Sequence, residues 1–467
     1  MKKILIISAT LFLSFPVFSQ NISGDWNGKI SISGIQLKIV FHISGKDKIY
    51  TATLDSPDQG AYDIPVDSVI FNNPDLKMVM TKLNAEYTGK YSKETNQITG
   101  NFKQAGQLFS LELAKSKTKI EKPKRYQEPE KPYPYLSEDI KFENTKAGIN
   151  LAGTLTLPKK GRKFPAVILI SGSGAQNRDE ELLGHKPFLI ISDYLTRKGI
   201  AVLRFDDRGT AKSEGDFGSA TSEDFATDVE AALNYLLSRK EIDENNIGLI
   251  GHSEGGLIAP MLAAKNNQIA FIVMLAGPGI PGDKLLLLQS QLIGKANGAS
   301  DKELKISKKL NKKIYAFLKN ESDTSIMKQN VYDLLAEEFD KQKNTNKLSG
   351  KQLKTQINRQ IKILISPWFR YFLSYNPAKT LKNVNCPVLA LFGEKDLQVP
   401  AEINEKAVKK ALSKAENNDF KTLIIPNLNH LFQECKTGSP KEYASIKQTF
   451  SPIALKKISD WIDSHIK

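Results

Sequence analysis

The sequence predicts a protein of two parts, the larger being an α/β fold built on a mostly parallel sheet. Three observations support this prediction. Residues 22–115 alternate apolar and polar side chains, which is typical of antiparallel strands. From residue 137, apolar strands alternate with amphipathic helices, which predicts a parallel sheet covered on both faces. Residues 280–373 interrupt that alternation with a helical pattern rich in lysine.

Length and composition are those of an ordinary globular protein. The chain has 467 residues, enough for two or three compact units, and 40% of them are hydrophobic. The formal net charge is +15, but the sequence contains no RNP or C2H2 pattern and no low-complexity basic tract. The charge therefore indicates solubility or loose attraction to anions, and no nucleic-acid partner is predicted.

Residues 1–19 have the pattern of an export signal. Two lysines precede a short apolar run, Ile4 to Phe15, and small side chains follow at Val17 and Ser19. We expect the mature chain to begin near Gln20 and to be periplasmic or secreted. An N-terminal membrane anchor is the alternative, but the run is short for a span. No other run approaches that length, so no membrane span is predicted in the mature chain.

The first domain is expected over residues 20–115 as a small antiparallel sheet or barrel. Residues 116–136 are rich in Pro, Lys and Glu, which is typical of an extended, semi-stiff linker. Residues 137–467 then form the α/β domain. Because open α/β sheets bind ligands at the carboxyl edge of their strands, the helical insert at about 280–373 is expected to lie there as a lid.

Within the α/β domain, strands and helices alternate in a regular order. Apolar strands are expected in segments 164–174, 200–209, 246–256, 269–279, 386–396 and 420–430. Helices are expected at 187–199, 222–240 and 256–265, from 402, and at 452–466. The second helix has Phe225, Val229, Ala232 and Leu236 on one face, so that face is predicted to pack on the sheet.

The segment Gly-His-Ser-Glu-Gly-Gly, residues 251–256, lies between a predicted strand and a predicted helix. A serine there would occupy a strained turn, and small residues are needed at Gly251 and Gly255 because a Cβ would collide across the turn. The turn would point Ser253 Oγ out of the sheet. The amide of Glu254, at the start of the helix, would face the same space and could bind an oxyanion.

A serine hydroxyl becomes a good nucleophile only when a base takes its proton. Of the five histidines, only His430 follows an apolar strand and lies in a loop. Asp396 also follows a strand and is the acid expected to orient His430, with Glu394 as its rival. Since parallel strands end at one edge of the sheet, Ser253, Asp396 and His430 are expected to converge there as a catalytic triad.

These pieces together resemble the α/β hydrolases, in the serine-hydrolase group that includes esterases, monoacylglycerol lipases and S33-type aminopeptidases. The resemblance covers about residues 137–467, and the segments that carry it are LISGSGAQNRDE, FDDRGTAKSEG, GHSEGG, LFGEKD and LNH. In the first domain, Gly24-Asp25-Trp26 resembles the opening of lipocalin-like barrels.

The resemblance also implies roles for two loops. The family's H-G-x-G loop corresponds to residues 171–174, with Ser171 in place of the histidine, and implies the amide of Ser173 as the second oxyanion donor. The family's D-x-R-G-x-G-x-S turn corresponds to DDRGTAKS, with Ala211 in place of the second glycine. Asp207, Arg208 and Ser213 in that turn are interpreted as structural.

Three residues are weaker candidates for substrate contact. Arg178, next to Asp179, follows the oxyanion loop, and a structural ion pair is the alternative. Trp368 and Phe369 lie in the aromatic segment SPWFRYFLSY and are candidates to line an acyl pocket. Packing of the insert against the sheet is the alternative for both aromatic residues.

The predicted function is that of an exported serine hydrolase that cleaves small carboxylic esters through an acyl-enzyme. An S33-type aminopeptidase is the alternative, and it would need an acidic group to hold the substrate ammonium, which the basic insert disfavours. A non-catalytic binding protein on the same scaffold is a third possibility, disfavoured because all three triad candidates are present. Neither a metal nor an organic cofactor is predicted. The acyl and alcohol groups and the oligomeric state are left open.

Overall fold

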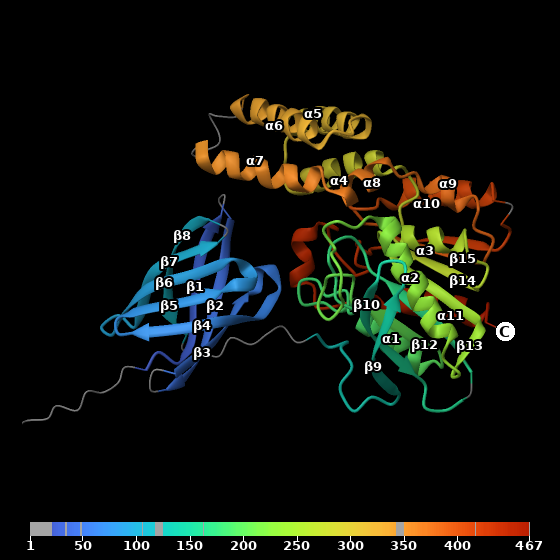
Figure 1. Ribbon diagram of the computed structural model, residues 1–467, viewed down its shortest axis with the longest axis horizontal. Helices are drawn as coiled ribbons and strands as arrows, with labels where there is room; N and C mark the ends of the chain where they lie inside the picture. The colour runs from blue at the N-terminus through green and yellow to red at the C-terminus, as the bar shows by residue number, and fades with distance from the viewer. Residues whose placement is uncertain are drawn as a thin grey trace, which may run out of the picture. The chain divides into compact units, whose positions relative to one another are not determined.

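The computed structural model describes residues 21–32, 35–46, 49–104, 106–116, 125–161, 163–341, 350–415 and 417–466. The predicted export signal lies outside these residues. Among the helices described, none is long and apolar enough to cross a membrane. The chain divides into two compact units, Met1–Pro123 and Lys124–Lys467, each of which is described by itself (Figure 1).

The first unit is a closed antiparallel barrel of eight strands, which confirms the predicted all-β domain. Its strands are β1 (Gly24–Ile32), β2 (Ile35–Lys46), β3 (Ile49–Ser56), β4 (Ala61–Asn72), β5 (Asp75–Met80), β6 (Ala85–Ser92), β7 (Gln97–Gln104) and β8 (Gln107–Lys115). Large side chains, including Trp26, Phe41 and Tyr87, are fully buried in one core. Trp26 Nε1 donates to the carbonyl of Ile22 at 2.7 Å, so its polar group is satisfied.

The second unit is built on an eight-stranded sheet in the order β16-β15-β14-β13-β11-β12-β10-β9. The strands are β9 (Leu136–Asn144), β10 (Ile149–Leu157), β11 (Phe164–Ile170), β12 (Ala201–Phe205), β13 (Ile242–His252), β14 (Phe271–Leu275), β15 (Val388–Gly393) and β16 (Phe420–Ile425). Strands β9 and β10 form an antiparallel hairpin, and the other six strands are parallel. Strands β12, β14 and β15 are buried throughout, as expected when helices cover both faces.

Five helices flank this sheet: α1 (Pro187–Arg197), α2 (Ser222–Leu237), α3 (Gly255–Ala263), α10 (Ala401–Ser413) and α11 (Pro452–Asp463). Helix α2 begins with a capping box in which the side chains of Thr221 and Asp224 satisfy each other's backbone N–H groups. Val229, Ala232 and Leu236 are buried against the sheet, which confirms the predicted apolar face. The strand–helix alternation predicted from the sequence is therefore present.

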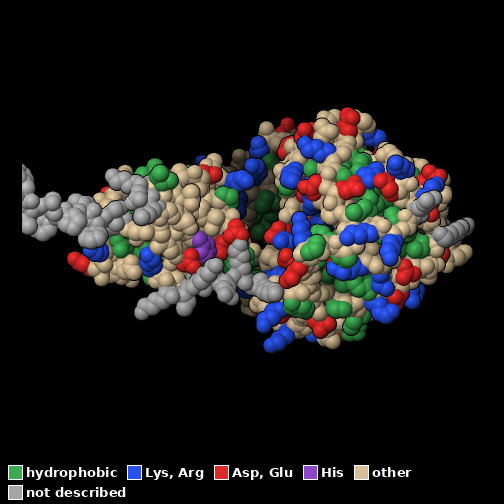
Figure 2. Space-filling view, turned by 90° about the horizontal axis from the view of Figure 1, so that it is seen from below, with side chains coloured by type: hydrophobic (Ala, Val, Ile, Leu, Met, Phe, Trp, Pro, Cys, Tyr) green, Lys and Arg blue, Asp and Glu red, His purple; other side chains and the backbone are tan. Residues whose placement is uncertain are grey.

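In the described residues, helices connect β14 to β15. They are α4 (Gly282–Ala296), α5 (Asp301–Asn320), α6 (Thr324–Lys341), α7 (Gly350–Leu364), α8 (Pro367–Ser374) and α9 (Pro377–Leu381). We call residues 282–374 the helical insert. It has a core of its own, which includes Ile314, Val331 and Ile357. Over the visible face of the second unit, basic and acidic side chains are interspersed rather than gathered in one patch (Figure 2).

The predicted linker, residues 116–136, differs from the structure in its second half. Arg125 is buried, and its guanidinium donates to the carbonyl of Leu183 at 3.0 Å. Gln127 Nε2 donates to the carbonyl of Phe450 at 2.7 Å. These side chains satisfy loop carbonyls of the second unit, so the chain from Arg125 onward is part of that unit.

Candidate active site

Ser253 lies on a sharp turn between β13 and α3. Its φ is 53°, in the left-handed region that a residue with a Cβ adopts only at a cost. A Cβ on Gly251 would come 2.0 Å from the carbonyl oxygen of Gly255. A Cβ on Gly255 would come 2.1 Å from the carbonyl oxygen of Ile170 in β11. Both positions therefore require glycine, as the sequence predicted.

Replacing Gly255 by Ala is expected to destabilise the second unit by about 3 kcal/mol, because the new methyl group meets backbone atoms that cannot move aside. The free energy of unfolding, from urea titration of both proteins, measures this effect. Gly350→Ala is the matched control, since a Cβ there meets nothing within 4 Å. Equal stability of the two variants would contradict the packing seen at the turn.

His430 follows β16 and is paired with Asp396, which follows β15. The distance from His430 Nδ1 to Asp396 Oδ2 is 2.7 Å, and both side chains are buried. The other carboxylate oxygen of Asp396 accepts the amides of Gln398 at 2.7 Å and Val399 at 2.9 Å. This arrangement places the Nδ1 proton against the carboxylate and leaves Nε2 as the nitrogen with a free lone pair.

The rival acid, Glu394, has a different partner. Its Oε2 accepts the amide of Asn427 at 2.8 Å, and the residue is exposed. Glu394 therefore does not orient His430 in this structure.

The remaining histidines outside the turn have other partners. His42 lies in the barrel between two aspartates, at 2.7 and 2.9 Å. His185 Nε2 is bonded to the carbonyl of Tyr443 at 2.9 Å, and burial lowers the pKa of His185 to about 4. His465 pairs with Asp419 at 3.1 Å near the end of the chain. None of these three lines the cavity at Ser253.

The loop after β11, residues 171–174, packs directly on the turn. A Cβ on Gly172 would lie 3.2 Å from Ser253 Cβ. Ser171 Oγ donates to Asp207 Oδ1 at 2.6 Å, and the other oxygen of Asp207 accepts the amide of Gln176 at 2.9 Å. Burial raises the pKa of Asp207 to about 8. Asp207 therefore braces this loop, in keeping with its predicted structural role.

Glu254 connects the turn to the helical insert. Its Oε1 accepts the Ser222 hydroxyl at 2.6 Å and the Trp368 indole N–H at 2.8 Å. Burial raises the pKa of Glu254, although the side chains of Ser222, Trp368 and Ser173 oppose the shift. Glu254, one of the two residues predicted to supply an oxyanion amide, is thus bonded both to α2 and to the helical insert.

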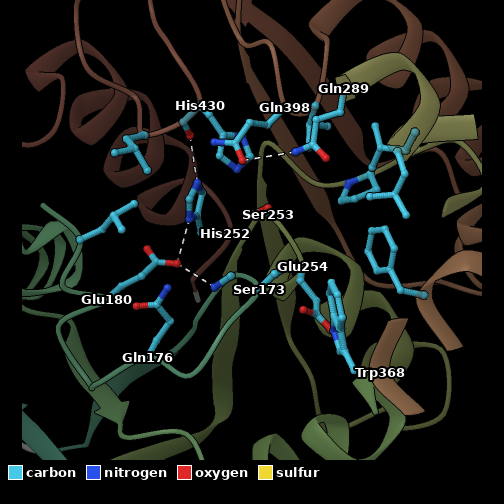
Figure 3. Close-up of a pocket in the computed structure, with 18 residues that line it drawn as sticks. Ser173, Gln176, Glu180, His252, Ser253, Glu254, Gln289, Trp368, Gln398 and His430 are labelled. Carbon is cyan, nitrogen blue, oxygen red and sulfur yellow. Dashed lines mark hydrogen bonds and ion pairs between the residues drawn. The ribbon is translucent and has the colours of Figure 1, made fainter. Parts of the chain in front are cut away.

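These groups surround a cavity of about 200 Å³ (Figure 3). It is lined by Gly172, Ser173, Gln176, Glu180, Leu182, His252, Ser253, Glu254, Pro278, Leu285, Leu286, Gln289, Trp368, Phe372, Gln398, Val399, His430 and Leu431. The walls contributed by α4 and α8 are mainly apolar, and the floor carries the polar groups of the sheet edge. Trp368, one of the weaker candidates, is among the lining residues.

The other two weaker candidates do not line this cavity. Arg178 Nη2 lies 2.7 Å from Asp206 Oδ2, and its Nη1 donates to the carbonyl of Gly153 at 2.7 Å, so the guanidinium braces the sheet edge. Phe369 packs on Tyr315 in the core of the insert, with ring centroids 5.9 Å apart. The structure therefore places neither Arg178 nor Phe369 at this cavity.

The helical period explains the difference between neighbouring aromatic residues in α8. Trp368 and Phe372 are four residues apart, stack at 5.4 Å and line the cavity. Phe369 and Leu373 are also four residues apart but lie on another face, in the core of the insert. The aromatic composition of the segment did not reveal which face meets the sheet.

Sequence reasoning missed two cavity residues that are bonded to each other. His252 Nδ1 lies 2.8 Å from Glu180 Oε1, and both side chains are buried. The glutamines Gln289 and Gln398, which meet across the cavity at 3.3 Å, were also missed. Glu180 ends the segment LISGSGAQNRDE and His252 lies in GHSEGG, but neither segment indicated a role for these two residues. No motif marked the glutamines, which come from α4 and from the loop after β15, and no local pattern shows that these two segments meet.

Metal ligation has no support in the part of the chain that is described. No group of three or more His, Cys, Asp or Glu side chains there could hold a metal ion. Cys386 and Cys435 are both free thiols, and burial raises the pKa of Cys386 to about 12.

The sheet order and the strand–serine–helix turn are those of the α/β-hydrolase fold. Residues 188–358 match the family model described as serine aminopeptidase, S33. Residues 358–456 match the model of the prolyl oligopeptidase family.

Individual proteins are also similar to parts of this chain. Esterase EstD of Thermotoga maritima is 28% identical over 308 residues, which cover 65% of this chain and 63% of EstD. An uncharacterized 31.7 kDa protein from the traX-finO intergenic region of Escherichia coli is 24% identical over 56% of this chain and 83% of its own length. The crystal structure of the α/β hydrolase GrgF from Penicillium sp. sh18 aligns with 71% of this chain and 99% of its own, at 15% identity and a TM-score of 0.44.

Proposed function

We propose that this protein is an exported serine esterase that hydrolyses small carboxylic esters, with Ser253 as nucleophile, His430 as base and Asp396 as the acid that orients it. The observation that supports this most strongly is the buried 2.7 Å pairing of His430 Nδ1 with Asp396, beside the cavity that exposes Ser253. The export signal pattern in residues 1–19 supports a periplasmic or secreted protein.

The proposed reaction has two halves. His430 Nε2 takes the proton of Ser253 Oγ as the oxygen bonds to the ester carbonyl carbon. The carbonyl oxygen gains negative charge and accepts the amides of Ser173 and Glu254. The C–O bond to the alcohol then breaks, and the alcohol leaves with the proton from His430. Water gives a proton to His430 as it bonds to the acyl carbon, and the bond from that carbon to Ser253 Oγ then breaks. His430 returns the proton to Ser253 Oγ, and the acid is released.

Ester cleavage is favoured over peptide cleavage because the acidic groups in the cavity are already bonded. An aminopeptidase needs a carboxylate available to the substrate ammonium. Glu254 accepts hydrogen bonds from the side chains of Ser222 and Trp368, and Glu180 is paired with His252. The similarity to an esterase supports the same choice, whereas the S33 and prolyl oligopeptidase family models keep peptide cleavage as the alternative.

The test uses protein that starts at Gln20 and a series of p-nitrophenyl esters, together with aminoacyl anilides. The cavity of about 200 Å³ is smaller than the ~300–1,000 Å³ of pockets that hold drug-sized ligands, so short acyl groups are expected to react fastest. A fluorophosphonate should label the peptide that contains Ser253. Faster cleavage of anilides than of every ester would replace the esterase proposal with the peptidase alternative.

The barrel is expected to be dispensable for turnover of small soluble esters, because the second unit has its own core and carries every cavity residue. A truncated protein beginning at Lys124, which keeps the docking of Arg125 and Gln127, should retain kcat within about threefold of the full protein. Starting at residue 130 instead would remove both side chains and should lower the thermal stability. A folded Lys124 protein without activity would contradict this prediction.

A further inference from the structure

Glu180 and His252 form a buried pair that the proposed reaction does not use. The side chains are only 6% and 8% exposed, and His252 Nδ1 lies 2.8 Å from Glu180 Oε1. The same carboxylate oxygen accepts the amide of Gly172, in the oxyanion loop, at 2.7 Å. On its other side, His252 Nε2 lies 2.9 Å from the carbonyl oxygen of His430. The chain of contacts runs from the oxyanion loop to the proposed base (Figure 3).

The partners determine the protonation state of His252. A carbonyl oxygen can only accept a hydrogen bond, so Nε2 of His252 must carry a proton to donate to the backbone carbonyl of His430. Glu180 Oε1 already accepts the amide of Gly172, which favours an ionised carboxylate that also accepts from Nδ1. Both ring nitrogens then carry protons, and His252 is an imidazolium.

The electrostatic surroundings agree with this state. Burial opposes the charge on His252, but the Glu180 carboxylate, the carbonyl of His430 and the charge of Asp396 outweigh it and raise the pKa of His252. Burial raises the pKa of two further carboxyls of the site, Asp207 and Glu254, which reduces the negative charge that they carry.

We propose that Glu180 and His252 are a positioning ion pair, which holds the oxyanion loop and the His430 backbone in register with the turn at Ser253. The proposal rests on the proposed function, since it assigns the pair a role in that reaction. Neither residue reacts with substrate. The pair acts through Gly172 on one side and through the backbone of His430 on the other.

The close packing of the site explains why the position of this ion pair would affect the reaction rate. Gly172 is packed between Ser253 and Glu180, since a Cβ there would be 3.2 Å from Ser253 Cβ and 3.3 Å from Glu180 Oε1. The rings of His252 and His430 are 4.9 Å apart. The oxyanion amide and the base lie on loops after different strands, β11 and β16. A displacement of about 1 Å between such groups can cost on the order of a hundredfold in rate.

The first measurement is the kinetics of Glu180→Gln on p-nitrophenyl acetate. This change keeps an acceptor for the amide of Gly172 but removes the charge that stabilises the imidazolium. We expect kcat to fall by about 10–100-fold with KM within about twofold, because the reacting groups are displaced while the apolar walls are unchanged. An unchanged kcat in the folded variant would overturn the proposal.

Asp228→Asn is the matched control. Asp228 is also a buried carboxylate of the second unit paired with a cation, with its Oδ2 2.7 Å from Arg208 Nε, but it does not line the cavity. We expect its kcat to stay within about twofold of the wild type even if its stability falls as much as that of Glu180→Gln. An equal loss of kcat in both variants would overturn the proposal, since general destabilisation would then explain the effect.

The second measurement is made on the wild-type protein and does not depend on turnover. NMR of wild-type protein with isotope-labelled histidine reports whether both nitrogens of each ring are protonated, and His252→Gln assigns the signal. We expect His252 to be doubly protonated at mildly alkaline pH, and a neutral His252 would overturn the proposal. If the wild type hydrolysed no ester, the proposed function would fail, whereas this spectrum would still test the ion pair.

Discussion

Ser253→Ala is expected to lower kcat for p-nitrophenyl acetate by about 10⁴–10⁶-fold, because no other group at the turn can form the acyl-enzyme. The fold should persist, since Ala adopts the 53° φ of Ser253 no less readily than Ser does. Initial rates with both proteins at equal concentration, checked by the loss of fluorophosphonate labelling, measure the effect.

Ser459→Ala is the control for this experiment. Ser459 is a buried serine in α11, with its hydroxyl bonded to the carbonyl of Lys456 and outside the cavity. Its removal should leave kcat unchanged within about twofold. If Ser253→Ala kept more than about a tenth of the activity, Ser253 would not be the nucleophile, and another group in the cavity would have to take that role.

Asp396→Asn is expected to lower kcat by about 10³–10⁴-fold, a smaller loss than that for the nucleophile. An amide N–H facing Nδ1 of His430 would donate a proton where the carboxylate accepts one. The proton would then be held on Nε2, so the imidazole could not take the proton of Ser253. The amides of Gln398 and Val399 can still bond to the remaining oxygen, which should preserve the loop.

Glu394→Gln gives this prediction a direct control, because Glu394 is the other acid that follows β15. It bonds to the amide of Asn427, so its substitution should change kcat by less than about twofold. A collapse of activity in Glu394→Gln with normal activity in Asp396→Asn would reverse the assignment of the acid. kcat and KM should be measured for both variants over a range of pH. A change in kcat alone would report the wrong tautomer of His430, whereas a change in KM would report weaker substrate binding.

Local patterns predicted the fold well because each reflects a burial rule that acts over a few residues. The alternation in residues 22–115 predicted an antiparallel sheet or barrel, and the structure has a closed barrel. The face of Val229, Ala232 and Leu236 predicted how α2 packs. The convergence of Ser253, Asp396 and His430 also followed from the sequence, since the carboxyl ends of parallel strands meet at one edge. Whether they act as a triad is for the variants above to decide.

Contacts between segments distant in sequence could not be predicted from local patterns. Arg178 was expected near substrate, but Asp206 and a strand carbonyl hold its guanidinium at the sheet edge. The end of the linker was misplaced because nothing in its composition shows that Arg125 would find loop carbonyls to bond.

The sequence by itself determined that this protein has a small all-β domain followed by a domain of the α/β-hydrolase fold with a serine on a strained turn, because hydrophobic period and glycine spacing are local properties. Only the tertiary structure decided what surrounds that serine. Glu180 meets His252 across 72 positions of the chain, and Trp368 meets Glu254 across 114. Such contacts depend on how whole elements pack, since burial brings together polar groups whose partners no local pattern specifies.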